Sequence, residues 1–427
     1  MSSTARIGAA SRRQRVPPAL TRGPDRLDGI AILDELKGDL GLVLWRSARN
    51  VRLWAETPLD RRGELFAGGA ALTRRQEVER LELDAELLAP MSVIVSLLEA
   101  PGRAEVQRLV NACRRIALWA EQRGALGTAL EFSLAAAQAA PESAALAYEV
   151  AGLARRSAQY DRAESWYSRA IVQGRQNEQW RAYALALIGM GNMAIRRGNF
   201  PAARRTHRKS LRAARRHGVR EAEAMAYHDL FVIEIETGAG AGSDADTYAA
   251  AAFAAYDPRS PRLARLGYDV AYNWTLHGYF ARALPVAQAL TPHFDAPVDL
   301  IMVHGLVARA AGGTGAEDTH AEAARRVRSL IEAEGAEEGA ARALLGVAYG
   351  AANLRNYEEA QAAALQALEI AMERKEGRVI VAAEAALESI RSGARVREAA
   401  EAPKQPVADE LAAGFVRVLS RPAVAAA

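Results

Sequence analysis

One short pattern recurs along the chain and constrains its fold more than any other feature. It consists of a polar turn, a bulky residue, and a small residue three positions later. The bulky residues are Leu126, Tyr160, Phe200, Phe280 and Tyr357, and the small ones are Ala129, Ala163, Ala203, Ala283 and Ala360. These alanines lie 34, 40, 80 and 77 residues apart, so the long gaps each have room for one more divergent unit. Repetition at such a period is typical of stacked arrays, in which each unit packs on the next.

The composition indicates that the repeated units are helical. The chain has 427 residues, of which 95 are alanine, whereas aromatic residues make up only 6%. Alanine is the best helix former, so an all-β fold is excluded. The single cysteine, Cys113, excludes a disulfide framework and any zinc site built from several thiolates. We expect Cys113 to be a small core residue.

The pattern resembles the tetratricopeptide repeat (TPR), a helix–turn–helix unit that stacks into a right-handed superhelix. Position 8 of that unit is usually small, and here it is Ala117, Ala151, Gly191, Ala271 or Ala348. Position 27 is Ala136, Ala170, Ser210, Leu290 or Ala367. One unit also has an aromatic residue at position 24 (Tyr167), and one has the closing proline (Pro141). The resemblance covers about residues 103 to 392 and implies an all-α, right-handed solenoid of TPR-like hairpins. A divergent bacterial member is the expectation.

Composition and the positions of glycine and proline divide the chain into four expected segments. They are a disordered basic leader (1–28), an N-terminal helical region (29–100), a TPR-like solenoid with a C-terminal capping helix (101–392), and a flexible alanine-rich tail (393–427). In the second segment we expect Thr57 to cap a helix that starts at Pro58, followed by helices over 74–88 and 91–99.

The middle of the array is less regular. Helices are expected from Ala226 and from Thr247, with a glycine-rich loop between them. A further unit is expected over Leu300–Glu332, interrupted by a second glycine-rich stretch, and helix 377–392 should cap the array.

No motif of a known catalytic or metal chemistry is present. Phosphate-binding loops, dinucleotide fingerprints, nucleophile elbows and HExxH patterns are all absent, and the seven histidines are scattered. The sequence therefore predicts a protein that is not an enzyme and that holds no metal and no cofactor.

The resemblance also implies a binding groove. In TPR proteins, five positions of each first helix face the concave surface. In this chain they include Arg114, Tyr148, Arg155, Arg156, Asn192, Arg196, His228, Tyr268, Tyr272, Tyr349 and Asn353. Tyrosine, arginine and asparagine offer contact area and directed hydrogen bonds, although the tyrosines could equally pack between helices. Asn192 matches the asparagine of the TPR carboxylate clamp, but Ile188 replaces its lysine, so that clamp is incomplete.

A basic ridge is the second candidate surface. Ten Lys or Arg and no acidic residue lie between Arg196 and Arg220. The ridge consists of Arg204, Arg205, Arg208, Lys209, Arg212, Arg215 and Arg216. It could be a solvated face, or it could bind an acidic protein or the phosphates of a nucleic acid.

Together these features predict a scaffold that binds a protein or peptide in the groove without covalent chemistry. The alternative is a sensor or regulator of bacterial transcription or signalling that contacts nucleic acid through the ridge, although no helix-turn-helix module is evident. The formal charge of only +4 argues against a general nucleic-acid binder. No apolar run is long enough to span a bilayer, so we expect a cytoplasmic protein with no membrane partner.

Overall fold

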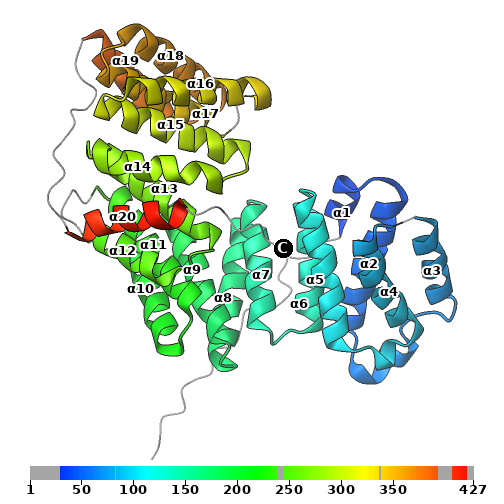
Figure 1. Ribbon diagram of the computed structural model, residues 1–427. Helices are drawn as coiled ribbons and strands as arrows, with labels where there is room; N and C mark the ends of the chain where they lie inside the picture. Colours follow the sequence, from blue (N-terminus) through cyan, green and yellow to red (C-terminus); the bar gives the residue numbers. More distant parts are fainter. Residues whose placement is uncertain (1–28, 82, 239–243, 336–337, 393–405, 421–427) are drawn as a thin grey trace, which may run out of the picture. The chain divides into compact units, whose positions relative to one another are not determined.

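The computed structural model describes residues 29–81, 83–238, 244–335, 338–392 and 406–420, and the expected basic leader lies outside them. Within these ranges every regular element is a helix, most of them long and packed as consecutive antiparallel pairs (Figure 1). This confirms the predicted all-α solenoid of TPR-like hairpins with extra helices before it. The chain separates into two compact units, which divide between Ala222 and Glu223.

The N-terminal unit begins with a group of helices of unequal length and continues as three hairpins. The first group is α1 (Ile30–Glu35), α2 (Gly38–Glu56), η2 (Leu59–Glu64), α3 (Ala70–Arg80), α4 (Ala85–Glu99) and η3 (Pro101–Arg103). The hairpins are α5 (Val106–Gln122) with α6 (Leu126–Ala139), α7 (Ala144–Arg156) with α8 (Tyr160–Gln176), and α9 (Trp180–Arg196) with α10 (Phe200–His217).

The repeated sequence pattern corresponds to one repeated turn. Each bulky residue is the first residue of a second helix, and the five alanines that follow are fully buried. Before each second helix, a backbone N–H reaches back five residues to a carbonyl of the first helix. Two of these bonds are Ala125 to Ala120 and Tyr279 to Trp274, both 2.9 Å. This hydrogen bond is that of the Schellman motif, and Gly124 and Gly278 have the positive φ that it requires.

Helices α1 and α2 cover the open side of the first hairpin. The Glu35 carboxylate accepts hydrogen bonds from the backbone N–H groups of Gly127 and Thr128, both at 2.7 Å, at the start of α6. Trp54 is almost completely buried, and its indole N–H donates to the Pro101 carbonyl at 2.7 Å. A terminal unit of an array needs such a cover, because its apolar face would otherwise meet water.

Two expectations for this region are wrong. Thr57 ends α2 instead of starting a helix, because its backbone is extended before Pro58, and its hydroxyl donates back to the Leu53 carbonyl at 2.7 Å. The predicted helices 74–88 and 91–99 are instead α3 and α4, separated at residues 81–84. Pro90 lies inside α4, where the buried stripe of Leu87, Met91 and Ile94 continues across it.

The C-terminal unit contains most of α11 (Arg220–Glu236) and the helices after it. They are α12 (Ala245–Ala255), α13 (Pro261–Leu276), α14 (Phe280–Leu290), η4 (Thr291–His293), α15 (Pro297–Thr314), α16 (Glu317–Glu334), α17 (Ala340–Asn353), α18 (Tyr357–Glu373), α19 (Gly377–Arg391) and α20 (Pro406–Leu419). The expected middle helices and the extra unit over 300–332 correspond to α11, α12, α15 and α16.

Helices α15 and α17 approach each other unusually closely, because glycines face each other across their contact. A methyl group added at Gly305 would lie 2.6 Å from the Ala343 Cα, and one added at Gly346 would lie 2.3 Å from the Gly305 carbonyl oxygen. Only glycine fits at such a distance. The side chains beside this contact are therefore brought close together.

Helix α20 lies within the segment for which the sequence predicted a flexible tail, and the structure differs there. Its buried residues Leu411, Phe415 and Leu419 pack on α12 and α14 (Figure 1). Phe415 meets Phe253 edge to face at 4.7 Å, and Arg282 pairs with Asp409 at 2.8 Å. The apolar spacing of residues 411, 415 and 419 is helical and is hidden in the sequence by the surrounding alanines. The remainder of the expected tail, apart from Ser420, lies outside the described residues.

Candidate ligand-binding pocket in the C-terminal unit

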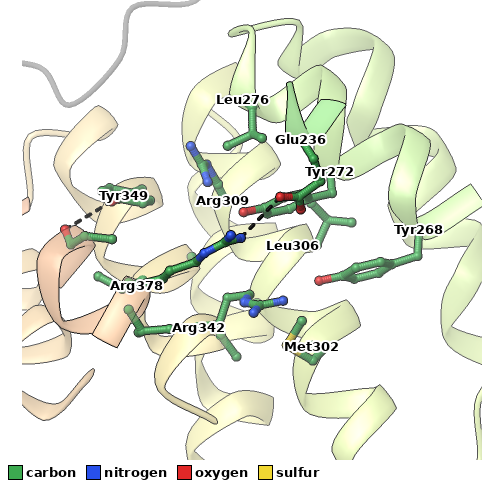
Figure 2. Close-up of a pocket in the computed structure, with 16 residues that line it drawn as sticks. Glu236, Tyr268, Tyr272, Leu276, Met302, Leu306, Arg309, Arg342, Tyr349 and Arg378 are labelled. Atoms are coloured by element: carbon green, nitrogen blue, oxygen red, sulfur yellow. Dashed lines mark hydrogen bonds and ion pairs between the residues drawn. The ribbon is translucent and has the colours of Figure 1, made fainter. Parts of the chain in front are cut away.

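One pocket of the C-terminal unit is lined by consecutive first helices. It has a volume of about 300 Å³ and receives side chains from α13, α15, α17 and α19, together with the last residue of α11. Consecutive first helices contact one another from α13 to α19, so one face of each is presented to the same space. Figure 2 shows the labelled side chains converging from these helices.

Helical spacing explains why these residues meet. Tyr268 and Tyr272 are four residues apart on α13, while Met302 and Arg309 are seven apart on α15. Residues separated by four or seven lie on one face of an α-helix. Arg342 and Tyr349 repeat the spacing of seven on α17.

The three tyrosines form the aromatic part of the pocket. The rings of Tyr268 and Tyr272 are parallel, with centroids 6.2 Å apart. Burial raises the pKa of both Tyr268 and Tyr349 above the ordinary tyrosine value, although neighbouring arginines oppose this shift. Their hydroxyls are therefore neutral near pH 7 and can donate hydrogen bonds. That of Tyr349 donates to the Ala382 carbonyl at 3.4 Å.

Arginine dominates the charge of the pocket. Arg309, Arg342 and Arg378 face a single acidic residue, Glu236, so the formal charge of the lining is +2. The guanidinium of Arg309 lies over the Tyr349 ring, 4.6 Å from its centroid. Arg378 pairs with Glu236 at 3.2 Å, and Arg342 is exposed, with no carboxylate partner among the described residues. Such a pocket can bind an anion and hold an aromatic or apolar group beside it.

Sequence reasoning found part of this site. Tyr268, Tyr272 and Tyr349 were predicted as groove residues, and the structure brings all three into the pocket. It missed Arg309, Arg342, Arg378 and Glu236. Arg342 stands six residues before Ala348, so it occupies position 2 of its unit and could have been found from the same register. Arg309 belongs to a divergent unit whose sequence lacks the repeated turn pattern, and so it offered no register.

Two other predicted groove residues of this unit do not line the pocket. His228 is buried, with Nε2 2.9 Å from an Asp269 oxygen and Nδ1 3.2 Å from the Tyr256 hydroxyl. These contacts join α11 to α12 and α13, so we assign His228 to packing. Asn353 is half-buried at the end of α17.

The predicted groove residues of the N-terminal unit lie on α5, α7 and α9, where several pair with each other's helices. Arg114 of α5 pairs with Glu149 of α7 at 2.6 Å, and Arg156 of α7 pairs with Glu121 of α5 at 2.6 Å. The half-buried Tyr148 ring lies 6.1 Å from that of Tyr167.

The other three residues of this groove are distributed along its surface. Arg196 lies over the Tyr160 ring at 4.4 Å, Arg155 is exposed, and Asn192 is half-buried. No single pocket described in this unit joins the six predicted residues.

The basic ridge is the outer face of α10. Its inner face packs against the hairpin through buried residues such as Ala203 and Ser210, whose hydroxyl donates to the Ala184 carbonyl at 2.8 Å. Arg204 is half-buried, and the other six ridge residues, Arg205, Arg208, Lys209, Arg212, Arg215 and Arg216, are exposed. Lys209 also lies 5.8 Å from the Tyr183 ring centroid.

The cysteine, which could in principle be reactive, lies in a structural position. Cys113 is fully buried, as predicted, and burial raises the pKa of its thiol to about 12, so it is not a nucleophile at neutral pH. Across the described ranges, no group of three or more His, Cys, Asp or Glu residues is arranged to hold a metal ion. Within the same residues, none of the helices combines the length and the apolar character needed to cross a bilayer.

Comparisons with known proteins assign the chain to no family. No family model matches the chain, and neither does any curated protein sequence. Among solved structures, it is similar to a Rap protein crystallised with competence and sporulation factor. That match has 13% identity over 79% of this chain and 99% of the other, with a TM-score of 0.47. A circular tandem repeat protein with a novel repeat topology has 15% identity over 84% of this chain and 98% of the other, with a TM-score of 0.17.

The architecture places the chain among helical-repeat proteins of TPR-like hairpins. At this level of similarity the neighbours say nothing about its ligand, which must be argued from the pocket itself.

Proposed function

We propose that the protein is a non-catalytic binding scaffold whose C-terminal unit holds a peptide, or an extended segment of a protein partner, on its first-helix face. The observation that carries this proposal is the convergence of three tyrosines and three arginines from four consecutive first helices on one pocket. Tyrosine and arginine are the residue types most enriched where protein interfaces gain their binding energy.

The size and the openness of this surface support a peptide. A volume of about 300 Å³ accommodates one or two side chains, and the lining combines apolar residues such as Met302 and Leu306 with directed donors. A peptide backbone running past the pocket would meet tyrosine hydroxyls, such as that of Tyr272, which can both donate and accept hydrogen bonds.

Affinity capture from an extract of the cells that make the protein tests this proposal. Wild-type protein is compared with Tyr272→Ala, which removes a ring from the pocket, and with Tyr148→Ala, which removes a groove tyrosine from the N-terminal unit. We expect a partner that the first variant loses and the second keeps. A partner list unchanged by Tyr272→Ala would contradict the proposal.

A second function is favoured by the exposed cations of α10: a regulator that contacts nucleic acid through the basic ridge. Arg205, Arg208 and Arg212 are exposed and occur at helical spacing. Reversing these three charges should abolish salt-sensitive binding of duplex DNA or RNA if the ridge has this role. If wild-type protein leaves both nucleic acids unshifted at low salt, the ridge is a solvated face.

A further inference from the structure

The mouth of the pocket is bridged by an ion pair between elements that are far apart in sequence. Glu236 is the last residue of α11, and Arg378 is the second residue of α19. Their carboxylate and guanidinium are 3.2 Å apart although 142 residues separate them in the chain. Figure 2 shows Arg378 extending across the pocket from α19 to reach Glu236 beside Tyr272.

This pair is easy to separate. The Arg378 side chain is 89% exposed and that of Glu236 is 38% exposed. Ion pairs at such exposure contribute little to stability, because water solvates both charges almost as well and salt screens their attraction. The fold therefore does not depend on this contact, and the contact can be exchanged for another.

The residues around this ion pair favour the replacement of Glu236 by another anion. Once Glu236 moves away, Arg378 and Arg342 are left without a carboxylate among the described residues, in a lining whose remaining members are neutral except for Arg309. In Figure 2 the guanidinium groups of Arg342 and Arg378 enter the same space, and the Tyr268 hydroxyl points toward Arg342. Two guanidinium groups beside a hydroxyl donor suit a carboxylate, which accepts up to four hydrogen bonds.

We propose that Glu236 and Arg378 form a latch across the pocket, which a peptide carboxylate opens by taking the place of Glu236 on Arg378 and by binding Arg342 as well. The apolar and aromatic lining then holds the peptide side chain next to that carboxylate. This inference rests on the proposed function and adds to it the chemical class of the ligand and the way in which the ligand enters.

Selection from random peptide libraries tests the proposal. One library displays peptides with a free C-terminal carboxylate, and a second displays them with the C-terminus blocked, so that only Asp and Glu side chains supply carboxylates. The full-length protein is the bait, and a charge-neutral variant of the pocket, Arg342→Gln with Arg378→Gln, is the counter-selection. We expect wild-type-specific binders that are rich in Asp and Glu, or that depend on the free C-terminus, and the two libraries distinguish these sources.

The latch itself is tested on one selected peptide. Glu236→Gln removes the internal competitor, so affinity should rise by about two- to five-fold, as expected for loss of an exposed ion pair. Arg378→Gln should lower affinity, and in that background Glu236→Gln should have no further effect. Arg325→Gln, which breaks another exposed ion pair, that with Glu322 on α16, is the matched control.

The possible failures are distinguishable. Pocket-dependent binders that are neutral or basic would overturn the carboxylate and the latch but leave the proposed function intact. Acidic binders whose affinity falls with Glu236→Gln would overturn the latch alone. Binders that are insensitive to both Arg342→Gln and Tyr272→Ala, or no binders at all, would overturn the proposed function itself. Circular dichroism of each variant excludes misfolding as the cause.

Discussion

Both units carry arginines on their first helices that pair with an acidic residue of another first helix, and the C-terminal unit adds two pocket arginines in other surroundings. In the N-terminal unit, Arg114 and Arg156 are each paired with a glutamate of the other's helix, so these arginines tie α5 to α7. In the C-terminal unit, Arg309 lies over Tyr349, and Arg342 has no carboxylate partner among the described residues. The difference is whether a glutamate of a neighbouring first helix lies within reach of the guanidinium, as Glu149 does for Arg114. Whether a first-helix arginine is available to a ligand therefore depends on the acidic residues of the neighbouring first helices.

The largest expected effect is on the free energy of unfolding of the C-terminal unit, and it comes from the packing of α20 on α12 and α14. Phe415→Ala should lower the free energy of unfolding of this unit by about 3–5 kcal/mol, because a fully buried ring leaves a cavity between α20 and α12. Hydrogen-exchange mass spectrometry should show faster exchange in α12, α14 and α20, and unchanged exchange in α5 to α8. Equal acceleration in both units would mean that they do not unfold separately.

The next largest effect distinguishes an arginine of the pocket from a paired arginine of the N-terminal unit. Arg342→Gln should weaken binding of a pocket ligand by about ten-fold or more, because it removes a charge-assisted hydrogen bond worth roughly 1.5–3 kcal/mol. Arg114→Gln should leave that affinity unchanged. Isothermal titration calorimetry with one selected peptide measures both variants. The contrast between the units is lost if the two substitutions weaken binding equally.

Glycine substitutions give a similar or smaller effect and test the close helix contact. Gly305→Ala should destabilise the C-terminal unit by about 1–3 kcal/mol, since the new methyl would overlap α17 and force the helices apart. Gly152→Ala, in α7, meets no atom within 4 Å and should stabilise the protein by about 0.5–1 kcal/mol through helix propensity. Urea denaturation curves report both changes. A neutral Gly305→Ala would show that α15 and α17 can separate without cost.

The smallest effect is that of an ion pair. Replacing Glu149 by Gln should cost about 0.2–1 kcal/mol at low salt, because the Arg114 side chain is 50% exposed and its partner 32% exposed. The difference should vanish near 1 M NaCl, where screening acts over about 3 Å. Thermal melts at the two salt concentrations measure it. A cost that persists at high salt would indicate that Glu149 contributes through packing.

The fold was predictable because its signal is local and repeated. The turns before α6, α8, α10, α14 and α18 share one hydrogen-bond pattern, so bulky residues such as Tyr160 and Phe280 identify them in the sequence. Helix α20 was not predictable from that signal, because its partners Phe253 and Arg282 lie more than a hundred residues away in sequence. Part of the pocket was unpredictable for the same reason, because its residues are far apart in sequence. Tyr268 and Tyr349 follow from the repeat register, whereas the contact between Glu236 and Arg378 depends on how five successive first helices, α11 to α19, stack.

The return of α20 to α12 and α14 has a consequence for the order in which the protein can be made. The hairpins of the N-terminal unit consist of segments that are adjacent in sequence, so each can assemble as soon as its second helix leaves the ribosome. The apolar surface of α12 and α14 must instead wait until the ribosome has reached Leu419, about 165 residues after the end of α12 and about 130 after the end of α14. During that interval the nascent chain exposes the surface that Phe415 later covers, and a chain that ends within α19 would leave this surface exposed to water.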